Sequence, residues 1–156
     1  MVGALLTVPA GLNTFDRYGR GPQENYWDRH TGAFVGRYRT TVDAQYGPCV
    51  RPQQTGNVTD VRTATLTDRD GIGLQVTAEP GKDAPLLELS ALHHTPTDLD
   101  GPRHPYELER RAKTQLDVNH RQMGVGGNDS WGAPPLEKYL LHADRTYSCA
   151  YRLSPA

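Results

Sequence analysis

The sequence predicts an all-β fold of antiparallel strands, arranged as a sandwich or a barrel. Several short segments alternate apolar and polar residues with a period of two, which is typical of strands with one buried face. Clusters of Gly, Pro, Asn and Asp separate these segments and are typical of turns. No long segment keeps the 3.6-residue period of an amphipathic helix. Many short strands joined by such turns favour a sandwich or a barrel over a helical class.

The clearest strand is expected near the C-terminus. Between residues 147 and 153, Tyr, Cys, Tyr and Leu alternate with Ser, Ala and Arg. A second alternating run, 72–78, follows a run rich in β-branched residues, 61–67. The sequence DRDG at 68–71 separates these two runs, and Asp-Gly is a strong signal for a hairpin turn. Residues 61–78 therefore predict a β-hairpin.

Further strands are expected along the rest of the chain. Alternation predicts strands at 87–91 and 116–118, and weaker patterns predict strands at 5–8, 13–18 and 34–38. Glycine and proline predict breaks at 19–22, 47–52, 80–81 and 96–105, and in the glycine-rich stretch 123–132. The best helix candidate, 105–113, is short and begins at a proline. No linker or internal repeat divides the chain, so residues 1–156 are expected to form one domain.

Composition argues against nucleic-acid binding and against a membrane-spanning helix. The net charge is −1 without a basic block, which argues against nucleic-acid binding. The mean hydropathy is −0.67, and no run approaches the roughly 18 apolar residues of a membrane helix. The opening residues also lack the basic region of a secretory signal. With two isolated cysteines, Cys49 and Cys149, these features lead us to expect a cytoplasmic location.

The usual catalytic constellations have little support. Glu107 with Glu109, and Asp98 with Asp100, are carboxylate pairs two residues apart, but acidic residues in loops are usually solvated. The histidines, including His93-His94 and His104, lack metal-ligand spacing and are expected to be structural. No nucleophile elbow or nucleotide-binding glycine motif is present. We therefore expect no catalytic residue, metal or cofactor in this chain.

Two motifs remain as candidate sites: one is rich in charged, amide and aromatic residues, and the other is rich in glycine. In YGRGPQENYWDR (18–29), Arg20, Glu24, Asp28 and Arg29 are expected to form an internal salt-bridge cluster that fixes a loop against a sheet; the alternative is a polar cleft. In MGVGGNDSWG (123–132), four glycines place one indole, Trp131. That ring is either an anchor that folds back on the chain or a platform on which the C–H face of a sugar can stack. Composition alone leaves both readings open.

Four motifs in order resemble one known family. YGRGPQENYWDR, RPQQTGNVTDVR (51–62), HPYELE (104–109) and MGVGGNDSWG are similar to the C-terminal domain, or small chain, of bacterial β-galactosidases of glycoside hydrolase family 2. The ending LHADRTYSCAYRL (141–153) agrees, so the resemblance extends from about residue 12 to 153. It implies a β-supersandwich related to galactose mutarotase, of which this chain resembles only the C-terminal half. Exposed sheet edges would then favour pairing, and a homodimer is an expected outcome.

The resemblance also implies a division of labour. In this family the catalytic glutamates belong to a separate TIM-barrel domain, and the Mg and Na ions that family members often use are bound mainly elsewhere. The chain would therefore be an accessory domain that hydrolyses no β-galactoside, such as lactose, by itself. Its partners would be the rest of the β-galactosidase, including the barrel, and the glucose (aglycone) side of the substrate.

The same resemblance assigns substrate contact to the glycine-rich motif. Trp131 matches a tryptophan that stacks on the aglycone sugar, and Asn128 and Asp129 are expected chiefly to shape its turn. Two alternatives remain open. One is a stand-alone carbohydrate-binding module that uses Trp131 and Trp27. The other is a mutarotase-like aldose epimerase that uses His93, His104 and Glu107 as acid and base.

Overall fold

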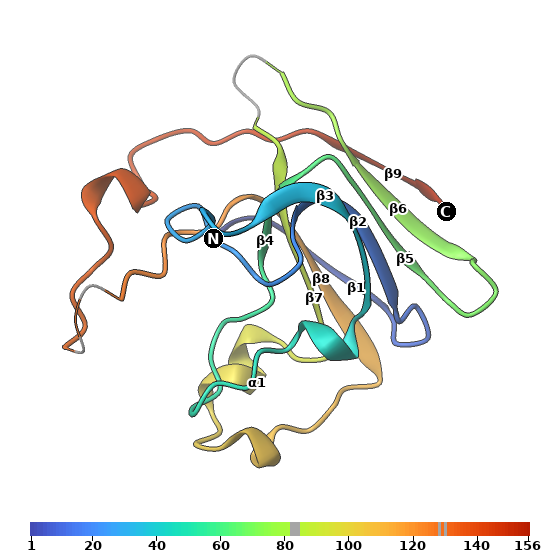
Figure 1. The fold of residues 1–156 in the computed structure, drawn as a ribbon, viewed down its shortest axis with the longest axis horizontal. Coiled ribbons are helices and arrows are strands. Elements are labelled where there is room, and N and C mark those ends of the chain that lie inside the picture. The colour runs from blue at the N-terminus through green and yellow to red at the C-terminus, as the bar shows by residue number, and fades with distance from the viewer. Residues whose placement is uncertain (82–84, 128, 130) are drawn as a thin grey trace.

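Two antiparallel sheets form the body of the protein (Figure 1). The computed structural model describes residues 1–81, 85–127, 129 and 131–156. One sheet has the strand order β1-β8-β7-β4 and the other has the order β3-β2-β5-β6-β9. The strands are β1 Val2–Pro9, β2 Thr14–Gly21, β3 Phe34–Thr41, β4 Val58–Val61, β5 Thr63–Thr67, β6 Gly73–Ala78, β7 Leu87–Leu92, β8 Lys113–Arg121 and β9 Tyr151–Pro155. The expected all-β, antiparallel sandwich is confirmed.

Among the residues that the structure describes, helical structure is confined to short turns. The helix α1 spans Pro96–Asp100, and 3-10 turns lie at Asp43–Gln45, Pro105–Glu107 and Glu137–Tyr139. The helix candidate at 105–113 thus reduces to one 3-10 turn. In the described part of the chain, no helix is long and apolar enough to cross a membrane.

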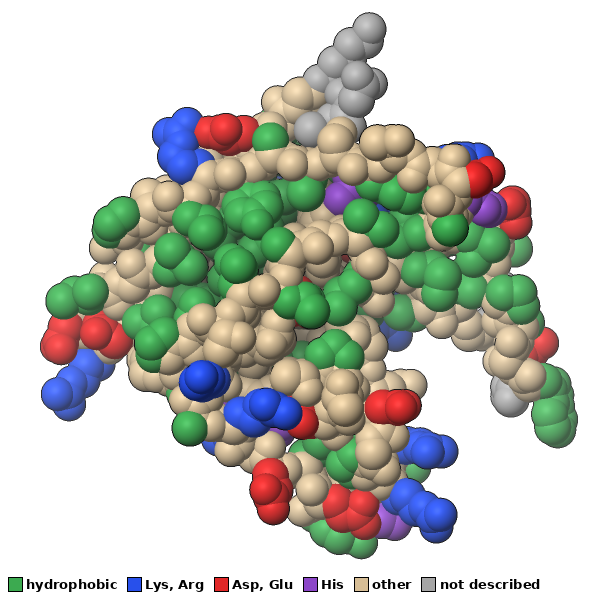
Figure 2. Space-filling model, turned by 180° about the vertical axis from the view of Figure 1, so that it is seen from behind, with side chains coloured by type: hydrophobic (Ala, Val, Ile, Leu, Met, Phe, Trp, Pro, Cys, Tyr) green, Lys and Arg blue, Asp and Glu red, His purple; other side chains and the backbone are tan. Residues whose placement is uncertain are grey.

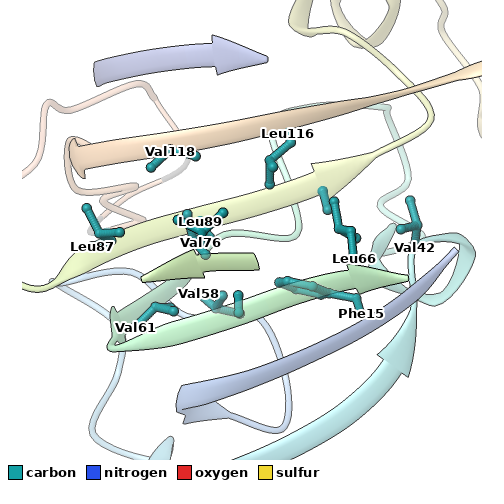
Figure 3. Packing of buried hydrophobic residues seen from close by; sticks show 12 residues of the cluster. Phe15, Val42, Val58, Val61, Leu66, Val76, Leu87, Leu89, Leu116 and Val118 are labelled. Carbon is teal, nitrogen blue, oxygen red and sulfur yellow. The ribbon is translucent and has the colours of Figure 1, made fainter. Parts of the chain in front are cut away.

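Both sheets contribute to one hydrophobic core (Figure 3). Strand β2 follows the alternation rule, because each second residue from Phe15 onward is buried. Phe15 and Leu66 approach the core from one sheet, and Leu89 and Val118 approach it from the other. All four are at most 2% exposed, so the interior between the sheets excludes water.

The predicted hairpin is present as β5 and β6. Leu66 pairs with Leu74, and Thr67 pairs with Gly73. The Asp68 carboxylate closes the turn by accepting hydrogen bonds from the N–H groups of Asp70 (2.9 Å) and Ile72 (3.0 Å). Gly71 has φ +82°, which a side chain would disfavour.

The predicted break at residues 19–22 is wrong for its three N-terminal residues. Strand β2 continues to Gly21 and pairs with β3 along its whole length. At Gly19 a Cβ would lie 3.0 Å from Val61 Cγ2, because β4 of the other sheet approaches here. The glycine therefore serves close packing between backbones and does not end the strand.

The C-terminal strand is shorter than predicted. Residues 147–152 keep the expected alternation, and Cys149 and Tyr151 pack on the core. The ladder with β6 begins only where Tyr151 pairs with Ala78. Glu79 adds one further bond to Ala150, and Pro80 follows without an N–H group to donate. The partner strand therefore ends before residues 147–149 can join the sheet.

The N-terminus of α1 carries a reciprocal cap that supports a small prediction. Asp98 N–H donates to the Thr95 hydroxyl (3.3 Å), and Thr95 N–H donates to the Asp98 carboxylate (2.7 Å). Thr95→Ala should lower the free energy of unfolding by about 1 kcal/mol in a urea titration. Thr97→Ala, an exposed position in the same helix, is the control and should change it by less than about 0.5 kcal/mol. Equal effects at both positions would contradict a capping role.

Candidate functional site

The glycine-rich segment extends away from the two sheets, between β8 and β9 (Figure 1). In this segment the Trp131 side chain is 92% exposed. A ring this exposed buries almost no apolar area within the chain, so it does not anchor the loop. The indole face is open to a molecule or surface outside the described residues.

The turn that carries Trp131 is ordered by Asp129. One carboxylate oxygen of Asp129 accepts hydrogen bonds from the backbone N–H groups of Trp131 (2.9 Å) and Ala133 (3.2 Å). These bonds lower the pKa of Asp129, so the carboxylate is ionised near neutral pH. Gly132 has φ +86°, which fits a tight turn. The third predicted site residue, Asn128, lies outside the described residues.

The first dense motif does not form the single salt-bridge cluster that was expected. Glu24 pairs with Arg29 (2.7 Å), but Arg20 pairs with Asp60 (2.5 Å). Asp28 instead accepts a hydrogen bond from the N–H of Gly126, 98 positions along the chain (2.9 Å). Residues of this motif, together with residues 30–33, also line an open pocket of about 540 Å³. The pairing is distributed because strand β4 and the glycine-rich segment each supply a partner.

Glu24 joins this motif to the segment before β4. Its carboxylate accepts hydrogen bonds from the Thr55 hydroxyl (2.7 Å) and the Gly56 N–H (2.8 Å). Burial raises the pKa of Glu24, but the bonds from Gly56, Thr55 and Arg29 outweigh burial and leave it lowered. The ionised carboxylate holds residues 24–29 against residues 55–56.

The histidine and carboxylate candidates have structural environments. His93 is 3% exposed; its Nε2 lies 2.9 Å from Arg110 Nη2, which donates, and its Nδ1 lies 3.2 Å from the Thr114 hydroxyl. His104 stacks on an exposed tyrosine, and Glu107 accepts hydrogen bonds from the backbone of its own turn. Among the residues described, no hydrogen bond or ion pair joins His93 to His104 or Glu107. The geometry gives an epimerase acid–base pair no support.

A buried polar layer on the outer face of β7 and β8 was missed. The alternation in 87–91 predicts that Glu88 and Ser90 are exposed, yet they are 2% and 1% exposed. Ser90 donates a hydrogen bond to Asp117 (3.0 Å), itself 3% exposed. Asn57 donates to Glu88 (3.2 Å), so the segment before β4 covers this face of the sheet. Period-two alternation cannot reveal a loop that covers the polar face.

Burial shifts the pKa of the Glu88 carboxyl group. Desolvation raises its pKa to about 7, against lowering contributions from the Gln122 N–H (2.9 Å) and Arg121 (3.8 Å). Burial also raises the pKa of Asp117. These groups are enclosed, so we expect their ionisation to affect the stability of the fold, and we do not assign them to contact with substrate. In the parts of the chain that the structure covers, no three His, Cys, Asp or Glu residues are placed to hold a metal ion.

Comparisons with known proteins agree on one family. Residues 1–153 match the family described as "Beta galactosidase small chain". The β-galactosidase of Priestia megaterium is 42% identical over 99% of this chain, and that of Streptococcus thermophilus is 37% identical over 98%. The β-galactosidase of Halalkalibacterium halodurans is 39% identical over 88% of the chain. The chain spans only 13–14% of the length of these relatives.

Proposed function

The chain belongs to the beta-galactosidase small-chain family, and from this premise we propose that it serves as an accessory domain of a β-galactosidase, an enzyme that hydrolyses terminal β-D-galactosides. In this role it carries no catalytic carboxylate pair and presents Trp131 to the aglycone sugar bound by another part of the enzyme. The observation that carries the proposal is the 92% exposed indole on a turn ordered by Asp129. An aromatic face held in this way can stack on the C–H face of glucose.

An incompletely covered core supports docking to another part of the enzyme. Leu6 and Val8 on the edge strand β1, and Leu74 and Tyr151 on β6 and β9, pack against the core while remaining partly exposed. Figure 2 shows broad areas of apolar side chains on one face of the molecule. Apolar areas of this kind on a small domain mark contact surfaces. We propose that the rest of the galactosidase covers these three strands, of which β1 and β9 lie at sheet edges.

Kinetics of a chimera test the role of Trp131. In this chimera the chain replaces the 154 matching residues of the Priestia megaterium β-galactosidase. Trp131→Ala should raise the KM for lactose about tenfold, the equivalent of about 1.4 kcal/mol of lost stacking. Inhibition by glucose should weaken by a similar factor, while inhibition by galactose stays within about twofold.

A second exposed aromatic is the control for this substitution. Tyr106 is 83% exposed and lies in the 3-10 turn Pro105–Glu107, so Tyr106→Ala should leave the KM unchanged. Equal loss of glucose and galactose affinity in Trp131→Ala would contradict the aglycone role. Saturable binding of galactosides by the chain alone would instead favour a carbohydrate-binding module. Trp27 is a poor second platform for such a module, because Arg121 and Tyr139 already contact its ring.

A further inference from the structure

We propose that Asp28 is a positioning residue, which sets where the Trp131 turn projects from the domain. This inference deepens the proposed function and rests on it. Asp28 accepts the N–H of Gly126 at 2.9 Å, across 98 positions of sequence. Gly126 is five residues before Trp131 and has φ +67°. A charge-assisted bond at this point fixes the base of the turn, whereas Asp129 fixes only its tip.

At Gly124 the backbone of the loop lies very close to the Asp28 carboxylate. A Cβ on Gly124 would lie 2.6 Å from Asp28 Oδ2 and 2.9 Å from Tyr139 Cβ. The N–H of Gly124 donates to the Tyr139 carbonyl (3.0 Å), which ties the outgoing limb of the loop to the returning limb. The backbone therefore approaches Asp28 more closely than any side chain would permit. This glycine serves the approach of the loop to its anchor.

The segment that carries Asp28 is itself firmly held. Tyr26 and Arg29 exchange backbone hydrogen bonds (3.1 and 2.8 Å), and the Tyr26 side chain is 1% exposed. Asn25 N–H donates to the Asn57 carbonyl (2.7 Å), which joins this turn to the segment before β4. Asp28 thus projects from a turn that the buried Tyr26 anchors. A bond from a fixed turn to a loop restricts the loop.

Aromatic packing beside Asp28 fixes both limbs of the loop to the same turn. The Trp27 ring meets Tyr139 edge to face, with centroids 5.4 Å apart, and Arg121 lies 4.5 Å over it. Arg121 ends β8, directly before the loop, and Tyr139 lies on the returning limb. Gln122 N–H is held in turn by the buried Glu88. The hydrogen bond from Gly126 to Asp28 adds to these contacts, and of all of them it is the nearest to Trp131 in sequence.

Hydrogen exchange tests the anchor directly. In the 156-residue chain, Asp28→Ala should speed exchange of the Gly126 amide at least about tenfold, because its acceptor is gone. Asp28→Asn, which can present a carbonyl oxygen to the same N–H, should restore most of the protection. Asp68→Ala is the matched control, since Asp68 also accepts two backbone N–H groups, but in the β5–β6 turn. Wild-type exchange at Gly126 in Asp28→Ala would overturn the inference.

Kinetics of the chimera separate positioning from general damage. Asp28→Ala should raise the KM for lactose about fivefold through misplacement of the ring, with kcat for a nitrophenyl galactoside within twofold. Asp28→Asn should recover the KM, and Asp68→Ala should leave it unchanged. If Asp28→Ala fails to fold, Gly124→Ala tests the same seat, because its methyl group would collide with Asp28 and raise the KM similarly.

The two proposals fail in different ways. If Trp131→Ala leaves the KM for lactose unchanged, the proposed aglycone role is wrong, although exchange at Gly126 still measures the anchor. If Trp131→Ala raises the KM but Asp28→Ala and Gly124→Ala do not, the loop is positioned without Asp28 and this inference is overturned.

Discussion

Added to a Priestia megaterium β-galactosidase that lacks its matching segment, this chain is expected to restore hydrolysis of o-nitrophenyl galactoside. The rate should rise with the concentration of the chain and saturate about 100-fold above that of the truncated enzyme, the scale of loss expected when a substrate-positioning element is missing. Under the proposed function, docking covers the partly exposed apolar side chains on β1, β6 and β9, and it places Trp131 beside the aglycone site, which the o-nitrophenyl group occupies in this substrate.

Two leucines on β1 give a matched control for this complementation. Leu6 packs on the core edge and remains partly exposed, whereas Leu5 points to the other face of the strand and is 57% exposed. Leu6→Lys should raise the concentration of chain needed for half-maximal rescue, while Leu5→Lys should not. Circular dichroism would establish that both variants are folded. A failure of the wild-type chain to raise the rate at saturating concentration would contradict the accessory role.

Between pH 5 and 7.5 the domain is expected to lose stability as the pH rises, chiefly because of Glu88. Its pKa is about 7 in the folded chain and 4.5 without the fold, so the folded state binds more protons in this interval. The free energy of unfolding therefore falls as pH rises, by up to about 3 kcal/mol for a shift of this size. The raised pKa of Asp117 acts in the same direction.

Glu88→Gln removes this titration while keeping an oxygen for Gln122 N–H. The variant should be more stable than wild type at pH 8 by about 2–3 kcal/mol and should show a flatter dependence on pH. Urea titrations at pH 5, 6.5 and 8 give the comparison. Glu79→Gln, at an exposed ion pair with Arg152, is the control and should leave the pH dependence unchanged. A Glu88→Gln chain with the wild-type pH profile would contradict a raised pKa at Glu88.

The fold could be predicted where local sequence and tertiary packing demand the same conformation. The β5–β6 hairpin is such a case, because alternation, β-branched residues and an Asp-Gly turn all agree. Strand β4 was missed, since its four residues are nearly all buried and show no alternation. Residues 147–149 have the right period, but their neighbouring strand ends before reaching them. Periodicity reports which residues face the core, whereas a hydrogen-bond ladder depends on the partner strand.

The candidate site, like the fold, could be predicted only where residues close together in sequence decide the structure. Four glycines around one tryptophan predicted a shaped turn, and Asp129 does close it. Asp28 was placed in the wrong partnership, because its acceptor role depends on a backbone group 98 positions away. Glu88 was expected to be exposed, because nothing near it in sequence indicates that Asn57, from the segment before β4, donates a hydrogen bond to its carboxylate. Contacts between segments distant in sequence decide both cases.

The most direct test of the account is a cryo-electron microscopy structure of the chimera, with lactose bound in a catalytically inactive form. We expect the Trp131 indole to lie within about 4 Å of the glucose ring, face to face. We also expect Gly126 to remain bonded to Asp28. A glucose ring enclosed by other side chains, with Trp131 out of contact, would contradict the account.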